Sequence, residues 1–127
     1  MADLRSPVAR VRGLGSAKDG THHWWLQRLT AVALVPLTVW FAVSLLRFAP
    51  EGQAAVRAWI ASPVTMVMLI LAIAVGLWHA ALGIQVVIED YVHTEGWRIG
   101  MDIAVKFAAA LLTVASVVAI FKIAFGG

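Results

Sequence analysis

Three long apolar runs divide the chain, at about residues 29–47, 64–89 and 103–125. A helix rises about 1.5 Å per residue and the hydrocarbon core of a bilayer is about 30 Å thick, so about 20 apolar residues cross it as a helix. Each run is long enough for this. The pattern predicts an all-α membrane protein with three transmembrane helices.

Proline and the residues around it mark local features of these helices. Ser62-Pro63 precedes the second run, where serine suits the N-cap and proline the first helical position, because its missing N–H is not needed there. Pro36 falls inside the first run, where we expect a local kink that neighbouring helices accommodate. The segment 53–61 (QAAVRAWIA) predicts a short interfacial helix between the first two spans.

Basic residues predict the orientation. If the N-terminus is cytoplasmic, Lys and Arg divide seven to three in favour of that face, as the positive-inside rule requires. We therefore expect a periplasmic C-terminus, a mobile cytoplasmic tail over residues 1–20 and a three-helix anchor domain over residues 21–127. Tryptophans near the ends of the spans predict aromatic belts at the membrane interfaces: Trp24, Trp25, Trp59 and Trp97.

Composition narrows the function classes. The chain is 61% hydrophobic and only 13% charged, whereas about a quarter of the residues of a soluble domain are charged. The net charge of +3 reflects membrane topology, so we expect no nucleic-acid partner. The absence of cysteine excludes disulfides, thiolate ligation of haem and an iron–sulfur cluster held by this chain. No metalloprotease or serine-hydrolase motif occurs either.

His79 is the unusual residue of the second span. It lies about ten residues, or roughly 15 Å, from the expected cytoplasmic end, where an ionisable group is expensive and normally faces the bundle interior. At about 100° per residue, Gly76, His79, Gly83 and Asp90 share one narrow face. One interpretation is structural: the glycines form a packing groove and the histidine hydrogen-bonds a neighbouring helix.

The other interpretation of His79 is chemical. Neutral imidazole is a ligand of haem iron, and the glycines on either side leave room for a flat macrocycle. His79 is the only histidine deep in a span, so a haem with two histidine ligands would take its second ligand from another chain. This interpretation makes the protein a subunit of a complex.

Two further clusters flank the expected cytoplasmic face. Asp90 and Tyr91 end the second span and provide a carboxylate and a phenol where a quinone headgroup would rest; the alternative is an ordinary interfacial tyrosine beside a solvated acid. Arg28 precedes the first span and matches the carboxylate of a haem propionate. The alternative for Arg28 is a topology charge.

These residues resemble a known family, the small hydrophobic membrane-anchor subunit (D subunit) of bacterial succinate dehydrogenase, respiratory complex II. The motif is His79-x3-Gly83-x6-Asp90-Tyr91, in the segment HAALGIQVVIEDY. The resemblance implies that His79 is an axial ligand of a haem b whose other ligand comes from the second membrane-anchor (cytochrome b) subunit. It also implies that Tyr91 and Asp90 lie at the ubiquinone site, together with the iron–sulfur subunit.

A second match lies at the mouth of the first span, where His22-x5-Arg28 is followed by Leu-Thr-Ala in HHWWLQRLTA. The resemblance covers about residues 15–127 and implies that Arg28 and His22 lie near the haem propionates. Because the histidine is doubled, either His22 or His23 takes that role. The HHWW form is similar to the alphaproteobacterial branch of the family.

The resemblance therefore implies a multi-pass protein of the bacterial inner membrane that does no chemistry alone. It would dock the flavoprotein and iron–sulfur subunits to lipid and complete a succinate:ubiquinone oxidoreductase of the tricarboxylic acid cycle and electron transport. One alternative is the anchor of a fumarate reductase. An alternative of another class is a haem-free membrane scaffold or small transport subunit, in which His79 only joins helices.

Overall fold

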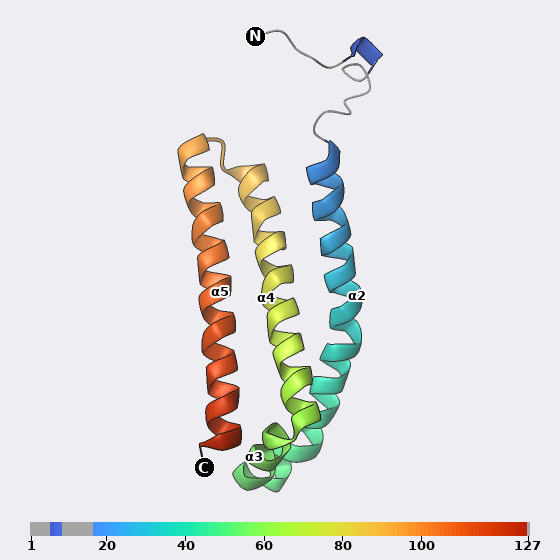
Figure 1. Ribbon diagram of the computed structural model, residues 1–127, viewed down its shortest axis with the longest axis vertical. Coiled ribbons are helices and arrows are strands. Elements are labelled where there is room, and N and C mark those ends of the chain that lie inside the picture. Colours follow the sequence, from blue (N-terminus) through green and yellow to red (C-terminus); the bar gives the residue numbers. More distant parts are fainter. Residues whose placement is uncertain (1–5, 9–16, 127) are drawn as a thin grey trace.

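The computed structural model describes residues 6–8 and 17–126, and all the long elements in this part of the chain are helices (Figure 1). Most of the expected tail, residues 1–5 and 9–16, lies outside the described residues. Three helices are long and apolar enough to cross a membrane, as the apolar runs predicted. The elements in chain order are α2 (Ala17–Phe48), the 3₁₀ turn η1 (Ala49–Glu51), α3 (Gln53–Ala61), α4 (Pro63–Tyr91) and α5 (Glu95–Phe125).

Helix α4 occupies the middle of the molecule, with α2 packed on one side and α5 on the other (Figure 1). Among the described residues, the backbones of α2 and α5 do not come close to each other. The start of α2 and the connection 92–94 lie at one end, here called the hairpin end, and α3 lies across the opposite end (Figure 1). The helices thus form an open row, in which the two sides of α4 face different neighbours.

The helix boundaries follow from glycine and proline. Ser62 is the N-cap of α4 and Pro63 its first residue, as predicted, although the cap acts through its backbone: the Ser62 carbonyl accepts a hydrogen bond from the Met66 N–H at 2.9 Å. Gly52 joins η1 to α3 with φ 98° and ψ 176°, a conformation essentially reserved for glycine. Pro36 lies inside α2, and that helix is visibly curved (Figure 1).

The buried core lies at the α3 end, around Trp59, Met66, Leu69 and Ile120. Trp59 is only 9% exposed and contacts the rings of Trp40, Phe41 and Phe48. Trp59 therefore lies at an end of the spans, as predicted, but within this chain it packs inward and is not an exposed ring of the belt. Helix α3 crosses the end of the bundle and turns this ring inward, whereas Trp24, Trp25 and Trp97 are exposed.

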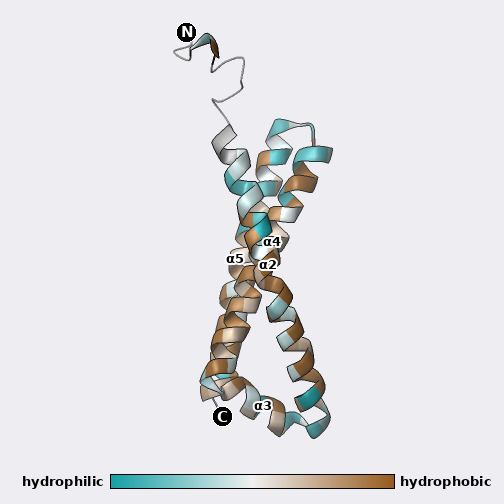
Figure 2. Cartoon of the chain, turned by 90° about the vertical axis from the view of Figure 1, so that its right-hand side faces the viewer, coloured by the Kyte–Doolittle hydropathy of each residue, from teal (hydrophilic) through white to brown (hydrophobic). Residues whose placement is uncertain are grey.

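The chain buries little of its own apolar surface. In the most apolar window of each long helix, only 6% to 11% of the residues are buried inside the chain. Hydrophilic residues gather at the two ends of the molecule, and hydrophobic ones cover the length between them (Figure 2). An apolar surface of this extent is unfavourable in water, so lipid or other chains must cover it. The molecule is a multi-pass membrane protein.

Candidate functional site

His79 lies on the side of α4 that faces α2. It is half-buried, and its Nδ1 is 2.9 Å from the hydroxyl oxygen of Thr30 on α2. The sequence analysis did not single out Thr30. The signal that could have found it is a hydroxyl side chain inside an apolar span, two residues after Arg28. Because Nδ1 makes this contact, only Nε2 of the imidazole remains for another partner, and no hydrogen bond to Nε2 exists within the described chain.

An open groove of about 410 Å³ runs along α2 beside His79. Its walls are apolar except for the imidazole and one hydroxyl, and they consist of Ala31, Leu34, Val35, Thr38, Val39 and His79. The groove is open to the side, so that a second chain can close it. His79 is the one ionisable side chain among its lining residues.

The two glycines on either side of His79 face α2 directly. A Cβ on Gly76 would lie 3.7 Å from Leu34 Cδ2, and one on Gly83 would lie 3.6 Å from Gln27 Nε2. Both distances are ordinary van der Waals contacts. A methyl group would therefore fit at either position, so within this chain the two glycines lie against α2 without being required for its approach. The open space for another group lies along α2.

Arg28 lies on the helix face that leads to this groove. It precedes Ala31 and Val35 by three and seven residues, a spacing that places all three on one side of α2. The residue is exposed, and its guanidinium lies 4.9 Å from the ring centroid of Trp24. Arg28 thus stands at the hairpin-end mouth of the groove, with its cation held against an aromatic ring.

The doubled histidines of α2 point in different directions. His22 is exposed, and six residues at about 100° each place it on a different face from Arg28. His23 is half-buried, with Nε2 buried and without a hydrogen-bond partner. It precedes Gln27 and Thr30 by four and seven residues, so it belongs to the face that packs on α4. The structure does not bring His22 to the groove.

Asp90 and Tyr91 form the last turn of α4 at the hairpin end. Both are exposed, Tyr91 by 76%, and neither makes a hydrogen bond or ion pair within the described chain. Twelve residues of helix separate Tyr91 from His79, about 18 Å along the axis. Asp90 lies on the same side of α4 as His79, whereas Tyr91 lies about a third of a turn further round. The phenol and the imidazole are thus two separate sites.

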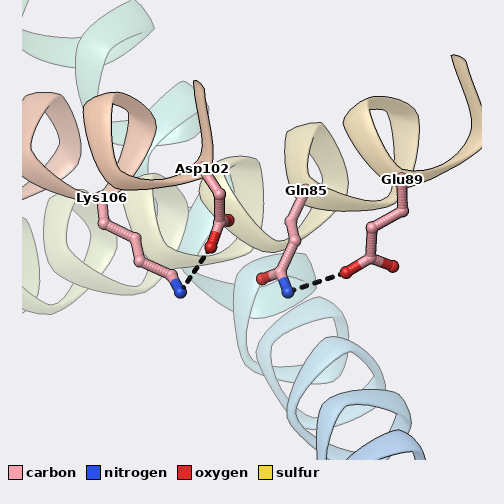
Figure 3. Close-up of polar contacts among 4 residues, drawn as sticks. All are labelled: Gln85, Glu89, Asp102 and Lys106. Carbon is pink, nitrogen blue, oxygen red and sulfur yellow. Dashed lines mark hydrogen bonds and ion pairs between the residues drawn. The ribbon is translucent and has the colours of Figure 1, made fainter. Parts of the chain in front are cut away.

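The opposite side of α4 carries a polar cluster that the sequence analysis did not single out (Figure 3). Lys106 Nζ donates to Asp102 Oδ2 at 2.8 Å on α5, and Gln85 Nε2 donates to Glu89 Oε1 at 3.0 Å on α4. The spacing of four residues within each pair was the available signal. Three of these residues, Gln85, Glu89 and Asp102, line a cavity of about 420 Å³. Its other lining residues are Ile88, Arg98 and Ile99.

The donor set around the groove fits a haem better than a bare metal ion. Among residues 6–8 and 17–126, no group of three or more His, Asp or Glu side chains is arranged to hold a metal ion. Haem iron already has four ligands from its macrocycle and asks the protein only for axial ones. One imidazole that lines an apolar groove, with no hydrogen bond to its Nε2 in the described chain, and a guanidinium near the groove's mouth fit that need.

Comparison with known proteins agrees with this architecture. The profile of the family described as "Succinate dehydrogenase/Fumarate reductase transmembrane subunit" matches residues 2–121. A relative from Rickettsia bellii named "Succinate dehydrogenase hydrophobic membrane anchor subunit" is 38% identical over 94% of this chain and 95% of its own length. A protein of the same name from Paracoccus denitrificans is 30% identical over 95% of this chain and 93% of its own length. The resemblance seen in the sequence is therefore confirmed, and the chain belongs to the succinate dehydrogenase/fumarate reductase transmembrane subunit family.

Proposed function

We propose that this chain is the small anchor subunit of a succinate:ubiquinone oxidoreductase in a bacterial inner membrane. In this proposal it shares a haem b with a second anchor subunit and contributes to the quinone site. The observation that carries the proposal is the half-buried His79, which is hydrogen-bonded through Nδ1 and lines an apolar groove, in a chain of this family.

His79 is the proposed axial ligand, bound through Nε2. When bound, the haem supplies a one-electron carrier inside the membrane. Arg28 would hold a propionate, because a guanidinium offers a carboxylate two parallel hydrogen bonds. His22 lies on another face of α2, so this part of the proposal rests on Arg28 alone.

The proposal includes a second membrane chain beside the same groove. The groove is open on one side and offers a single imidazole, so a second axial ligand would come from another chain. Helices α2 and α5 also leave broad apolar faces uncovered, including Val32, Val39, Phe107 and Leu111. A helical partner would pack there and close the groove. We place the iron–sulfur and flavoprotein subunits at the hairpin end, with the N-terminus cytoplasmic.

The quinone site is proposed at the hairpin end, at Tyr91 and Asp90. A quinone keeps its isoprenoid tail in lipid while its carbonyls reach donors at the membrane surface. The Tyr91 hydroxyl has no partner within the described chain and would donate to a carbonyl oxygen. Reduction to quinol consumes two electrons and two protons, and the exposed Asp90 carboxylate can pass protons inward from water.

Fumarate reductase is the alternative within this family, since the family description includes both enzymes. The relatives reported above carry the name of succinate dehydrogenase, which favours the succinate-oxidising assignment. The haem-free scaffold remains the alternative of another class. The hydrogen bond between His79 and a neighbouring helix is compatible with a scaffold. A scaffold, however, assigns no role to Nε2, which has no hydrogen-bond partner in the described chain.

The deciding experiment is substitution of His79 in the complex purified in mild detergent. His79→Ala should abolish or alter the reduced α-band of haem b, because an alanine cannot bind iron. His93→Ala is the control, since that histidine is exposed in the connection after α4. An unchanged low-spin spectrum in His79→Ala, or a wild-type complex without a b-type band, would overturn the proposal.

A further inference from the structure

Thr30 holds the imidazole of His79 through a hydroxyl with three polar neighbours. Its Oγ1 lies 2.8 Å from the Leu26 carbonyl oxygen, 3.0 Å from the Gln27 carbonyl oxygen and 2.9 Å from His79 Nδ1. A hydroxyl has one hydrogen to donate and lone pairs to accept. Carbonyl oxygens only accept, so the direction of the bond to Nδ1 depends on where that single hydrogen points.

Two arrangements satisfy these distances in the free chain. The hydroxyl can donate to Nδ1, and the imidazole then carries its own hydrogen on Nε2. Alternatively it donates to a carbonyl oxygen of α2 and accepts from Nδ1–H. In the second arrangement the Nε2 lone pair is free, on a residue whose side chain lines the groove. Only this arrangement makes His79 a ligand through Nε2, because an N–H cannot bind a metal.

We infer that Thr30 is the positioning residue for His79: it selects the tautomer with hydrogen on Nδ1 and fixes the plane of the ring beside the groove. The inference rests on the proposed haem function and adds to it the residue on α2 that orients the ligand. The hydrogen bonds then run from His79 Nδ1 to Thr30 Oγ1 and from Thr30 Oγ1 to the Leu26 carbonyl oxygen.

The backbone of α2 makes Thr30 suitable for this role. A threonine in a helix has few χ1 rotamers, and its hydroxyl commonly bonds the carbonyl three or four residues earlier. The Oγ1 position is thus set by α2 and not by the histidine. The close approach of α2 to α4 at Gly83 and Gly76 brings this fixed acceptor within reach. Serine can make the same bonds, but valine, which has the same shape, cannot.

The acceptor also tunes the ligand. A hydrogen bond to Nδ1–H makes imidazole a stronger donor to a metal and holds its orientation, and loss of such a partner typically weakens metal binding about 10- to 100-fold. Stronger donation stabilises the oxidised metal. Removal of the hydroxyl is therefore expected to raise the midpoint potential of the haem and to lower its retention.

The test compares Thr30→Val and Thr30→Ser in the intact complex in mild detergent. Haem content per complex and the haem midpoint potential are measured, together with the low-spin electron paramagnetic resonance signal. Thr30→Val should retain about tenfold less haem during dilution, with a higher potential and a shifted signal, while Thr30→Ser stays near wild type. Thr113→Val is the matched control, because its hydroxyl only bonds the Ala109 carbonyl oxygen, at 2.8 Å.

Wild-type haem content, potential and signal in Thr30→Val would overturn the inference. If that variant fails to assemble, Thr30→Ala and Thr30→Ser are compared in its place. A changed haem content, potential and signal in Thr30→Ala alone supports the positioning role, and the same values in both variants contradict it. Retention of the haem in His79→Ala would instead refute the proposed function. Loss of haem in His79→Ala together with a wild-type Thr30→Val would refute only the role of Thr30.

Discussion

Phe48 and Trp59 stack at the α3 end of the molecule, with ring centroids 5.7 Å apart and planes inclined by 20°. The contact joins the last residue of α2 to the short helix α3 across the turn at η1. The core of the chain is gathered here, while the candidate site lies toward the other end. Stability and function are therefore expected to respond to different substitutions.

Trp59→Ala should destabilise the chain by about 3 kcal/mol or more, because it empties a buried aromatic site. Trp97→Ala is the control, since Trp97 is 71% exposed and its loss leaves no cavity. The effect is measured by heating the purified complex and recording the temperature at which this chain aggregates. Equal midpoints for the two variants would show that the aromatic cluster at the α3 end is not a stabilising core.

Arg28→Lys should perturb the haem potential if Arg28 pairs with a propionate, because a point charge does not replace a planar fork of donors. Arg47→Lys is a matched control: both arginines are exposed on α2 near its ends, and Arg47 lies 5.3 Å from the ring centroid of Phe48. Redox titration of the complex is the measurement. Unchanged potentials in both variants would leave Arg28 as a topology charge.

Tyr91→Phe should reduce succinate-to-ubiquinone activity about tenfold if the lost hydrogen bond contributes about 1.4 kcal/mol. The ring remains, so haem content and assembly should not change. Succinate oxidation with an artificial acceptor that takes electrons before the quinone should stay at the wild-type rate. Wild-type ubiquinone reduction and inhibitor sensitivity in Tyr91→Phe would make this residue an interfacial anchor.

Asp90→Asn should give a milder form of the same defect, because it removes a proton-carrying group but leaves the Tyr91 hydroxyl in place. The pH dependence of ubiquinone reduction measures this, since proton delivery matters most when protons are scarce. Glu95→Gln is the comparison, an exposed acid in the first turn of α5. A loss in Glu95→Gln as large as that in Asp90→Asn would point to general surface charge.

Gly83→Leu should separate α2 from α4 and so break the contact between Thr30 and His79. Gly83→Ala should be tolerated, because its Cβ would meet Gln27 at 3.6 Å, an ordinary contact distance. Gly100→Leu is the control, since nothing lies within 4 Å of a Cβ at that position of α5. Haem content of the purified complex is the readout. Full haem content in Gly83→Leu would mean that α2 can shift without disturbing the site.

Much of this architecture follows from local physical chemistry, which is why the sequence by itself determined it. Membrane-spanning helices depend on runs of apolar residues, and the start of α4 at Pro63 depends on the lack of a proline N–H. The segment 53–61 is helical with the expected bounds. The motif around His79 also indicated the family, because all its residues lie within one helix and can be read from a single segment of the sequence.

Only the tertiary structure decided which residues of different helices meet. Trp59 turns inward because α3 crosses the end of the bundle, and no local pattern contains that crossing angle. Thr30 and His79 are 49 residues apart in sequence, and their contact depends on how closely α2 packs on α4. Helix periodicity assigns a residue to a face, but the neighbour of that face is set by the packing of the whole row. For this reason the sequence indicated His79 as a candidate ligand, and the structure supplied the Thr30 hydroxyl that contacts its ring.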